Sequence, residues 1–162
     1  MNEKVQAMIA LNRRAIKEGT IRWQIPENIE HFQFEPLIIQ QDGRDVGYAL
    51  VLSLDEARAI ATYRSLVIEI EKLFSSPQLL RTAFVAQVYV IPEARKSGTY
   101  RKLSDTFIGA MQARGLKHLV GGIKKWNEHS LKVHTRKGGF GWKIRSELGD
   151  GPEGWIIVSK DI

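Results

Sequence analysis

The run of apolar residues at positions 84–91 (FVAQVYVI) constrains the fold of this chain more than any other feature of its sequence. It is rich in β-branched and aromatic residues, alternates little between polar and apolar positions, and ends at Pro92. Such a run is typical of a strand at the centre of a sheet, covered on both faces. A second run of this kind, at 118–123, follows a helical pattern that extends to about Arg114. Two buried strands joined by a helix predict a parallel pair at the centre of a mixed α/β fold.

Weaker patterns around this pair predict the remaining elements. Asp42-Gly43 between two β-rich runs indicates a hairpin, and Ser53 with Glu56 has the spacing of a capping box. The expected order begins with a helix at 3–18 closed by Gly19, a short strand near 21–25 and a hairpin of strands at 37–39 and 46–52. One long helix then runs from Ser53 to the stop at 75–77, and the two central strands with their helix follow. The chain ends with a short helix at 127–137 and a hairpin of strands at 140–148 and 155–159. Since the chain has 162 residues and no linker-like segment, we expect one domain over 1–162.

Positive charge is concentrated in one third of the chain. The whole sequence has 24 Lys and Arg against 18 Asp and Glu. Residues 95–145 hold 13 of these cations and only two acids, Asp105 and Glu128, which gives this segment a net charge of +11. A segment so basic favours a polyanionic partner, such as nucleic acid, a membrane surface or a phosphorylated cofactor, although a solvated basic surface would give the same pattern.

Several classes of protein are excluded by what the sequence lacks. There is no cysteine, which rules out disulfides, thiol nucleophiles and thiolate metal sites. No stretch of about 18 apolar residues occurs, and the first residues lack the apolar core of a signal peptide, so we expect a cytoplasmic protein without a membrane segment. His129 and His134 lack both a metal-binding spacing and a carboxylate to complete a site, so no metal is expected. Ser97 lacks the G-x-S-x-G frame of a hydrolase nucleophile.

The segment between the first buried strand and its helix carries the chemistry. It runs from Pro92 through a short basic loop, and the helix begins near Tyr100. The first turn of a helix presents N–H groups without helical partners and the positive end of the helix dipole, so a loop leading into it suits a phosphate. Gly98 would let a phosphate approach the backbone closely. Four cations stand nearby: Arg95, Lys96, Arg101 and Lys102. On these residues alone, a plain strand-to-helix turn is the other interpretation.

Two motifs in sequence point to a known family. Arg95-x-x-Gly98-x-Tyr100 occupies the frame of a Q/R-x-x-G-x-G/A loop. After the next strand come Asn127, Ser130, His134 and then Gly139-Phe140. The arrangement resembles the GNAT superfamily of acyl-CoA-dependent N-acyltransferases over about residues 37–160. It departs from the family pattern where Tyr100 replaces a small residue, where His134 replaces the usual tyrosine, and where the chain opens with a helix.

The resemblance implies both a fold and a binding role for these positions. The fold would be a mixed, mostly antiparallel sheet with a central splayed parallel pair and flanking helices. The pantetheine arm of acetyl-CoA would lie along the backbone of Val88 and Val90, with Asn127 and Ser130 beside it. The pyrophosphate would be held by the Arg95 side chain and by the backbone N–H groups of Lys96, Ser97, Gly98, Thr99 and Tyr100.

In the reaction that the resemblance implies, a primary amine attacks the thioester directly within a ternary complex. His134 would donate a proton to the departing CoA thiolate, since imidazole ordinarily titrates with a pKa of about 6.5. The base that deprotonates the amine is open. Gln87, which cannot take a proton, stands where relatives often carry Glu. Glu93 is the nearby carboxylate, although a loop or capping role suits it equally, and water relayed by backbone carbonyls is the other alternative.

The partners and two competing functions follow from the same residues. The acceptor amine could belong to a small molecule or to a protein. The phosphates of coenzyme A account for the basic segment, so a nucleic-acid partner is not required. The final hairpin offers an edge for a homodimer. A CoA-binding protein of this fold without catalysis, and a basic nucleic-acid-binding module, are the alternatives that stay open.

Overall fold

The computed structural model describes residues 2–30 and 32–162, and the chain forms two compact units. The first unit comprises the chain up to Leu52 together with Val85–Ala113, and the second comprises Ser53–Phe84 and Arg114–Ile162. Strand β3 (Thr82–Val90) runs through the boundary, so it contributes to both units. Each unit is therefore assembled from two separate stretches of sequence, and the single domain expected over 1–162 stays a prediction.

The strands that the described residues form belong to one sheet in the order β1-β2-β3-β4-β6-β5. Besides β3 these are β1 (Leu37–Gln41), β2 (Arg44–Leu52), β4 (His118–Lys124), β5 (Lys143–Leu148) and β6 (Trp155–Asp161). β1 and β2 form the expected hairpin, with positive φ at both Asp42 and Gly43, and β6 pairs antiparallel with β4 and β5. The parallel pair is β3 with β4, which confirms the fold class inferred from the two buried runs.

The parallel ladder is short. It joins Thr82 to His118, Ala83 to Leu119 and Phe84 to Val120, all within the second unit. β3 continues to Val90 and β4 to Lys124, but these continuations belong to different units. The divergence expected of a splayed pair concerns those continuations and stays a prediction.

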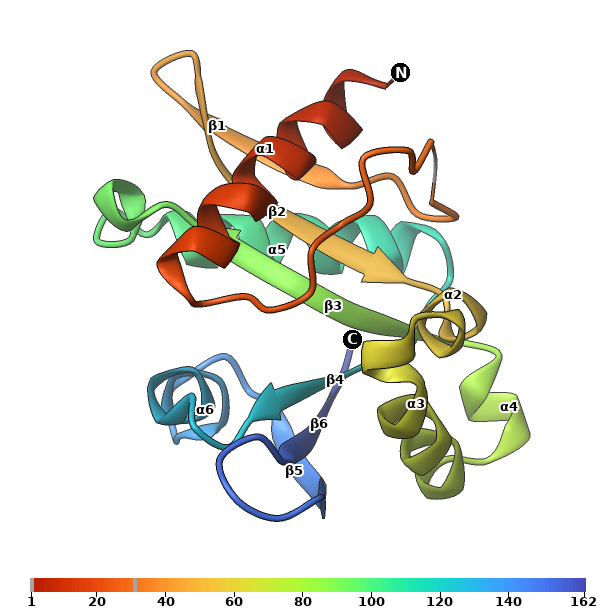
Figure 1. Ribbon diagram of the computed structural model, residues 1–162. Coiled ribbons are helices and arrows are strands. Elements are labelled where there is room, and N and C mark those ends of the chain that lie inside the picture. Colours follow the sequence, from red (N-terminus) through yellow and green to blue (C-terminus); the bar gives the residue numbers. More distant parts are fainter. Residues whose placement is uncertain (1, 31) are drawn as a thin grey trace. The chain divides into compact units, whose positions relative to one another are not determined.

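The first unit holds β1, β2 and the end of β3 between two helices. Helix α1 (Glu3–Glu18) begins at Asn2, whose side chain accepts the N–H of Lys4, and ends at Gly19 with a φ of 86°. Helix α5 (Thr99–Ala113) lies on the opposite face of the strands from α1 (Figure 1). β2 is buried at every position from 46 to 52, as a strand covered on both faces should be.

The second unit combines β4, β6 and β5 with helices, of which the helix Ala61–Leu73 contacts β5 and β6. Its helices are α2 (Leu54–Ala59), α3 (Ala61–Leu73), the short α4 (Ser76–Leu79) and α6 (Glu128–Thr135). Tyr63 of α3 is buried as expected, with its ring 5.2 Å from that of Phe84 and 6.4 Å from that of Trp155. Gly122 of β4 is needed here, because a Cβ would stand 2.5 Å from Leu66 and 2.7 Å from Trp155. Among the described residues, the helices fall short of the length and apolar character that a membrane-spanning helix requires.

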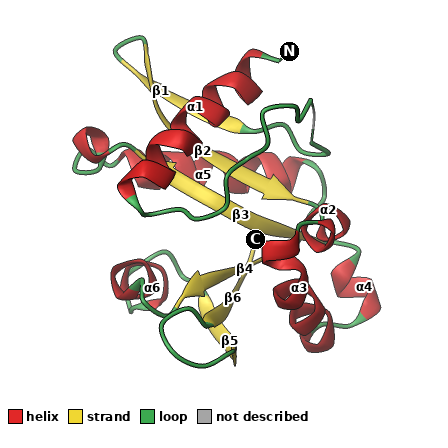
Figure 2. Ribbon diagram, viewed as in Figure 1, coloured by secondary structure: helices red, strands yellow, loops and turns green. Residues whose placement is uncertain are grey.

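The short strand expected near 21–25 is wrong. Figure 2 draws the described part of the segment between α1 and β1 as loop. Side chains, rather than a neighbouring strand, bind its backbone. Asn12 accepts the N–H of Ile25 at 3.0 Å, and both Asn12 and Gln87 donate to the carbonyl of Trp23. These side-chain contacts hold the segment 21–25 in place without strand pairing.

Two other boundaries differ from expectation. The single long helix after Ser53 is divided at Ile60, which is extended and whose carbonyl accepts from Tyr63 and Arg64 to start α3. Ser75 ends that pattern as expected but also caps the short α4. β5 begins at Lys143 rather than at 140, because the N–H groups of Phe140 and Trp142 return to carbonyls of α6.

Candidate active site

The loop after β3 makes one tight turn before α5 begins. A single 3-10 turn, Pro92–Ala94, follows the strand, and the hydroxyl of Ser97 donates to the carbonyl of Ala94 at 2.9 Å. The backbone bond from Lys102 N–H to the carbonyl of Gly98, 3.1 Å long, starts the helical ladder. Helix geometry leaves the N–H groups of the preceding turn without acceptors in the helix, and those groups point toward its N-terminal end.

Gly98 opens this turn to a ligand. Its φ is 73°, a left-handed conformation that glycine adopts without strain, and no atom lies within 4 Å of where a Cβ would stand. Residues 95–98 are exposed. An accessible backbone, the positive end of a helix and neighbouring cations together fit a phosphate group, and the resemblance implies the diphosphate of the cofactor here.

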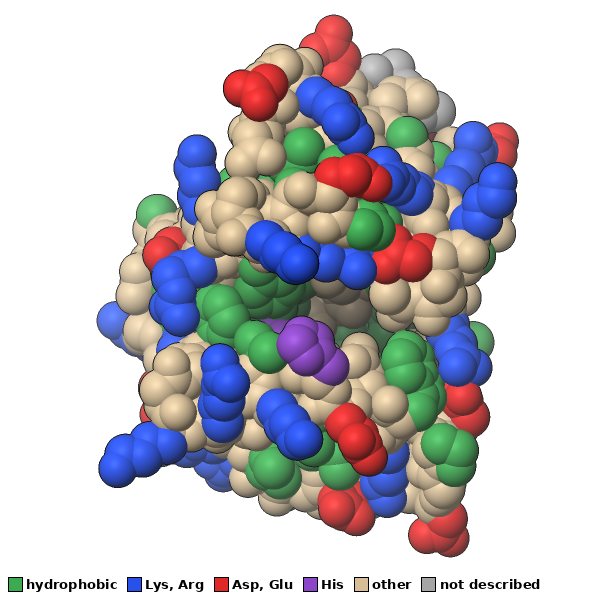
Figure 3. Space-filling model, turned by 90° about the vertical axis from the view of Figure 1, so that its left-hand side faces the viewer, with side chains coloured by type: hydrophobic (Ala, Val, Ile, Leu, Met, Phe, Trp, Pro, Cys, Tyr) green, Lys and Arg blue, Asp and Glu red, His purple; other side chains and the backbone are tan. Residues whose placement is uncertain are grey.

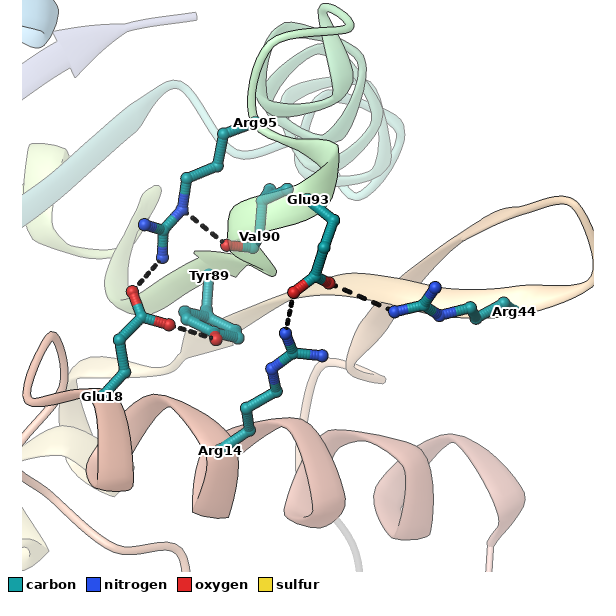
Figure 4. Close-up of polar contacts among 7 residues, drawn as sticks. All are labelled: Arg14, Glu18, Arg44, Tyr89, Val90, Glu93 and Arg95. Carbon is teal, nitrogen blue, oxygen red and sulfur yellow. Dashed lines mark hydrogen bonds and ion pairs between the residues drawn. The ribbon is translucent and has the colours of Figure 1, made fainter.

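Arg95 is held by polar contacts with Val90 and Glu18 in the first unit (Figure 4), and its Cζ lies 5.7 Å from the centroid of the Tyr89 ring. Its Nε donates to the carbonyl of Val90 at 2.9 Å, and its terminal nitrogen forms an ion pair with Glu18 at the end of α1. The second carboxylate oxygen of Glu18 accepts from the hydroxyl of Tyr89 at 2.7 Å. Burial alone would raise the pKa of Glu18, but the bonds from Arg95 and Tyr89 outweigh it and lower that pKa. Burial, followed by the Glu18 contact, raises the pKa of Tyr89 to about 12.

Glu93 lies between two guanidinium groups (Figure 4). Its carboxylate forms ion pairs with Arg14 of α1 and, at 3.1 Å, with Arg44 of β2. These pairs tie the loop after β3 to two other elements of the first unit. Glu93 as the base for the amine stays a prediction.

Tyr100, the residue that departs from the family loop, lies in the first turn of α5 and is half-buried. Burial raises the pKa of its phenol, so the side chain is neutral at physiological pH. It adds no negative charge to a loop expected to bind phosphate.

Gln87 of β3 is buried in a polar cluster of the first unit. Its Oε1 accepts from the hydroxyl of Tyr48 at 2.6 Å and from Asn12 at 3.1 Å, while its Nε2 donates to the carbonyl of Trp23 at 3.0 Å. An amide suits this cluster because it accepts on one side and donates on the other. The position is occupied by a structural side chain without an ionisable group.

The second unit brings together the other three predicted site residues on α6. Asn127 caps the helix, with its Oδ1 accepting the N–H of Ser130 at 3.2 Å. One turn later, the Nδ1 of His134 lies 2.7 Å from the carbonyl of Ser130 and 3.2 Å from its hydroxyl. The rings of Phe140 and Trp142 pack against the imidazole at 5.6 and 6.3 Å.

The environment of His134 determines its protonation. Burial lowers the pKa of His134, and the opposing contribution of the Ser130 carbonyl does not restore it. The ring is therefore neutral at pH 7. Because a carbonyl only accepts, the 2.7 Å contact requires the hydrogen on Nδ1, which leaves Nε2 as a proton acceptor.

The family model described as the acetyltransferase (GNAT) family matches residues 8–140 of the chain. The chain belongs to the GNAT family. The comparison with curated proteins finds no match. Among solved structures, the GNAT protein is similar to the ribosomal-protein-S18-alanine N-acetyltransferase of Escherichia coli, with 14% identity and a TM-score of 0.67 over 100% of this chain and 90% of the other.

Two further structures share the GNAT fold with this chain. An N-acetyltransferase from Staphylococcus aureus Mu50 is 21% identical, with a TM-score of 0.64 over 98% of this chain and 93% of that one. The N-acetylglutamate synthase of Neisseria gonorrhoeae, complexed with coenzyme A and N-acetyl-glutamate, is 17% identical, with a TM-score of 0.64 over 99% of this chain and 33% of the other. At these identities, the likeness establishes the fold.

The expected site residues fall into two groups in this GNAT protein. The first unit holds Glu93, the end of β3 with Val88 and Val90, and the loop from Arg95 to Tyr100, and the second holds the three residues of α6. Sequence reasoning missed Glu18, Arg14 and Arg44, the partners of the loop. One signal was available for Glu18, because an acid at the C-terminal end of a helix opposes the helix dipole unless a cation binds it.

The positive charge of residues 95–145 in the GNAT protein is partly compensated by acidic side chains. Lys and Arg side chains are numerous on the face drawn in Figure 3, and acidic side chains lie among them. Among the described residues, the cations of the segment that have acidic partners within their own unit include Arg95 with Glu18, Lys124 with Glu153 and Lys125 with Glu147. No group of His, Asp and Glu able to hold a metal ion occurs among the described residues.

Proposed function

We propose that this GNAT protein is an N-acetyltransferase that transfers the acetyl group of acetyl-CoA to a primary amine by direct attack in a ternary complex. The observation that carries the proposal is the turn from β3 into α5, where an exposed, left-handed Gly98 precedes a helix start flanked by cations. Membership of the acetyltransferase family supports it, as does the coenzyme A bound to the structurally similar synthase. Acetyl-CoA would supply the acetyl group as an activated thioester.

Binding would divide between backbone and side chains. The N–H groups at the start of α5, with Lys96 and Arg95, would neutralise the diphosphate. The backbone of Val88 and Val90 would bind the amide groups of the pantetheine arm as an added strand does. Asn127 and Ser130 would hold the arm from α6.

The proton transfers are assigned to His134 in its neutral form. Because Nδ1 donates to Ser130, Nε2 is the atom that can accept a proton from the substrate ammonium, which frees the amine lone pair for attack on the thioester. The imidazolium so formed would then return that proton to the departing thiolate, which is the donor role implied at this position. One residue would thus serve both transfers. The nitrogen would lose its second proton to solvent as the amide forms, so one proton is released overall and none remains on the enzyme.

Glu93 is the second candidate for the proton of the amine. It could accept that proton only at the expense of its ion pairs with Arg14 and Arg44. Burial lowers the pKa of His134, so its ring is neutral before the reaction, which favours it as the acceptor.

The test is release of CoA thiol from acetyl-CoA in the presence of candidate amines. A panel of a polyamine, an amino sugar, a free amino acid, a peptide with a free N-terminus and a lysine peptide covers the small-molecule and protein acceptors. We expect amine-dependent release with one class, and mass spectrometry should find the product heavier by one acetyl group. Release that is independent of every amine, or no release with saturating acetyl-CoA, would contradict an acetyltransferase.

A CoA-binding protein without catalysis is the second candidate, and the buried Gln87 favours it. This side chain is fully engaged with its neighbours and has no ionisable group to serve as a base. That candidate predicts a rise in melting temperature with acetyl-CoA and no acetyl transfer to any amine. An acetylated product would exclude it.

A further inference from the structure

Glu18 occupies an unfavourable place for a carboxylate. It is the last residue of α1, where the helix dipole is negative, and its side chain is only 23% exposed. The cost is offset by two specific contacts, the ion pair with Arg95 and the hydrogen bond from Tyr89 (Figure 4). The Glu18 carboxylate is thus placed to hold the Arg95 guanidinium.

The same contacts leave Arg95 in a position that conflicts with cofactor binding. Its Nε donates to the carbonyl of Val90, a backbone group proposed above for the pantetheine arm. Its guanidinium is paired with Glu18, although it is the side chain proposed for the diphosphate. The Arg95 side chain therefore covers part of β3 that is proposed to bind the cofactor. Its positive charge is at the same time neutralised by Glu18.

We propose that Glu18 is a positioning residue that holds Arg95 over the Val90 carbonyl, so that the diphosphate of the cofactor must draw Arg95 away from Glu18 before the pantetheine arm can use that carbonyl. The inference rests on the proposed function, because it assumes that a CoA ester binds at this loop. It adds a competition between two anions, the Glu18 carboxylate and the diphosphate, for one guanidinium.

The competition predicts the direction in which a change at Glu18 alters the affinity for CoA. Apparent affinity is reduced by the fraction of protein in the binding-competent state, so weakening the closed state raises affinity. Glu18→Gln removes the charge that holds Arg95 over the Val90 carbonyl. We expect the variant to bind CoA about fivefold more tightly, within the usual range of coupling between two ligands for one element.

The substitution should leave the fold intact, because α1 has another ion pair to the same region. Arg14 remains paired with Glu93 of the loop. The matched control is Glu27→Gln, which removes the same charge from an ion pair with Arg13 of the same helix. Circular dichroism and melting curves would verify both variants.

The experiment measures the dissociation constant of CoA by calorimetry for the wild type, Glu18→Gln, Arg95→Gln and the double variant. Glu18→Gln should bind more tightly, Arg95→Gln more weakly, and the double variant like Arg95→Gln, because Glu18 acts only through Arg95. Glu27→Gln should stay within twofold of the wild type. A gain that persists without Arg95, or affinity in Glu18→Gln equal to or below that of the wild type, would overturn the proposal.

A second readout is the hydrogen exchange of the Arg95 side chain. In free wild-type protein, the Nε–H of Arg95, assigned in nitrogen-15 spectra by its loss in Arg95→Gln, should exchange slowly with solvent. Exchange should be faster in Glu18→Gln and in the CoA complex. Fast exchange in the free wild type would overturn the closed contact itself. Failure of every variant to bind CoA would overturn the proposed function and this inference together, whereas binding unaffected by Glu18→Gln would overturn this inference alone.

Discussion

At the scale of single residues, His134 makes the sharpest prediction about activity. If its neutral ring accepts the proton of the amine, the turnover of His134→Phe should fall about 100-fold at saturating acetyl-CoA. The wild type should lose kcat/KM as pH falls through the lowered pKa of His134, because protonation fills Nε2. His134→Phe should not show this loss of kcat/KM at low pH. Unchanged turnover in His134→Phe would remove this residue from the mechanism.

The same residue predicts the direction of a stability change with pH. Its pKa is lower in the folded protein than the ordinary value of about 6.5. Between those two values the unfolded chain binds more protons, so stability rises with pH through this window and is lost as pH falls. Urea unfolding at pH 5 and pH 7 should therefore show a smaller pH effect in His134→Phe than in the wild type. An equal pH effect in both proteins would contradict a buried neutral His134.

Gln87 predicts a stability effect separate from the reaction. Gln87→Leu removes the acceptor that Tyr48 and Asn12 share and the donor to Trp23, which should lower the free energy of unfolding by about 1–3 kcal/mol. Gln112→Leu on the exposed surface of α5 is the control and should change stability by less than about 0.5 kcal/mol. Equal urea midpoints for the two variants would show that the cluster contributes little.

Residues whose role depends on local sequence were predictable, and those with distant partners were not. Gly98 was identified from its place between a strand and a helix, and its φ of 73° agrees with that role. The partner of Arg95 lies 77 residues away in sequence, and that of Gln87 at Tyr48 lies 39 away. Contacts between residues so far apart in sequence depend on how the helices and strands pack together. One sequence taken alone does not reveal that packing.

At the scale of elements, the start of α5 can be tested with a matched pair of glycines. Gly98 and Gly115 stand at opposite ends of this helix, both have positive φ, and neither has an atom within 4 Å of a Cβ. Alanine at either position should cost about 1 kcal/mol of stability through backbone strain. Only Gly98→Ala places a methyl group where a diphosphate would lie, so only it should weaken CoA binding, by about tenfold or ~1.4 kcal/mol. Equal CoA affinities in the two variants would argue against phosphate binding at this turn.

Element boundaries were predictable where side chains mark them. Asn2, Gly19, Ser53 with Glu56, and the Asp42-Gly43 turn all end or begin elements as their chemistry requires. The division at Ile60 has no such mark, because that residue offers only its backbone carbonyl as a cap. The segment 21–25 has strand-like composition, but its hydrogen bonds go to side chains of other elements.

At the scale of the whole molecule, charge connects the sequence to the proposed cofactor. The excess of +11 lies in residues 95–145, which include the proposed diphosphate loop, α5 and α6. A nucleic-acid module would use such an excess as a broad surface, with one counterion released for each phosphate contacted. A cofactor site would use only the cations next to its phosphates. The two uses predict different responses to the same substitutions.

Two double variants of equal charge change separate a cofactor site from a nucleic-acid surface. Lys96→Gln with Lys102→Gln removes two cations at the loop and α5, and Lys117→Gln with Lys143→Gln removes two exposed cations of the second unit. For an acetyltransferase, only the first pair should weaken CoA binding, and added salt should weaken it moderately in the wild type by screening. Saturating acetyl-CoA should raise the melting temperature by about 5–10 °C, the shift expected from about 2.7 kcal/mol of binding at 100-fold excess over Kd. A short DNA duplex should neither reproduce that shift nor displace CoA. Duplex binding that is steeply salt-dependent, equally sensitive to both pairs and indifferent to CoA would instead assign the basic segment to nucleic acid.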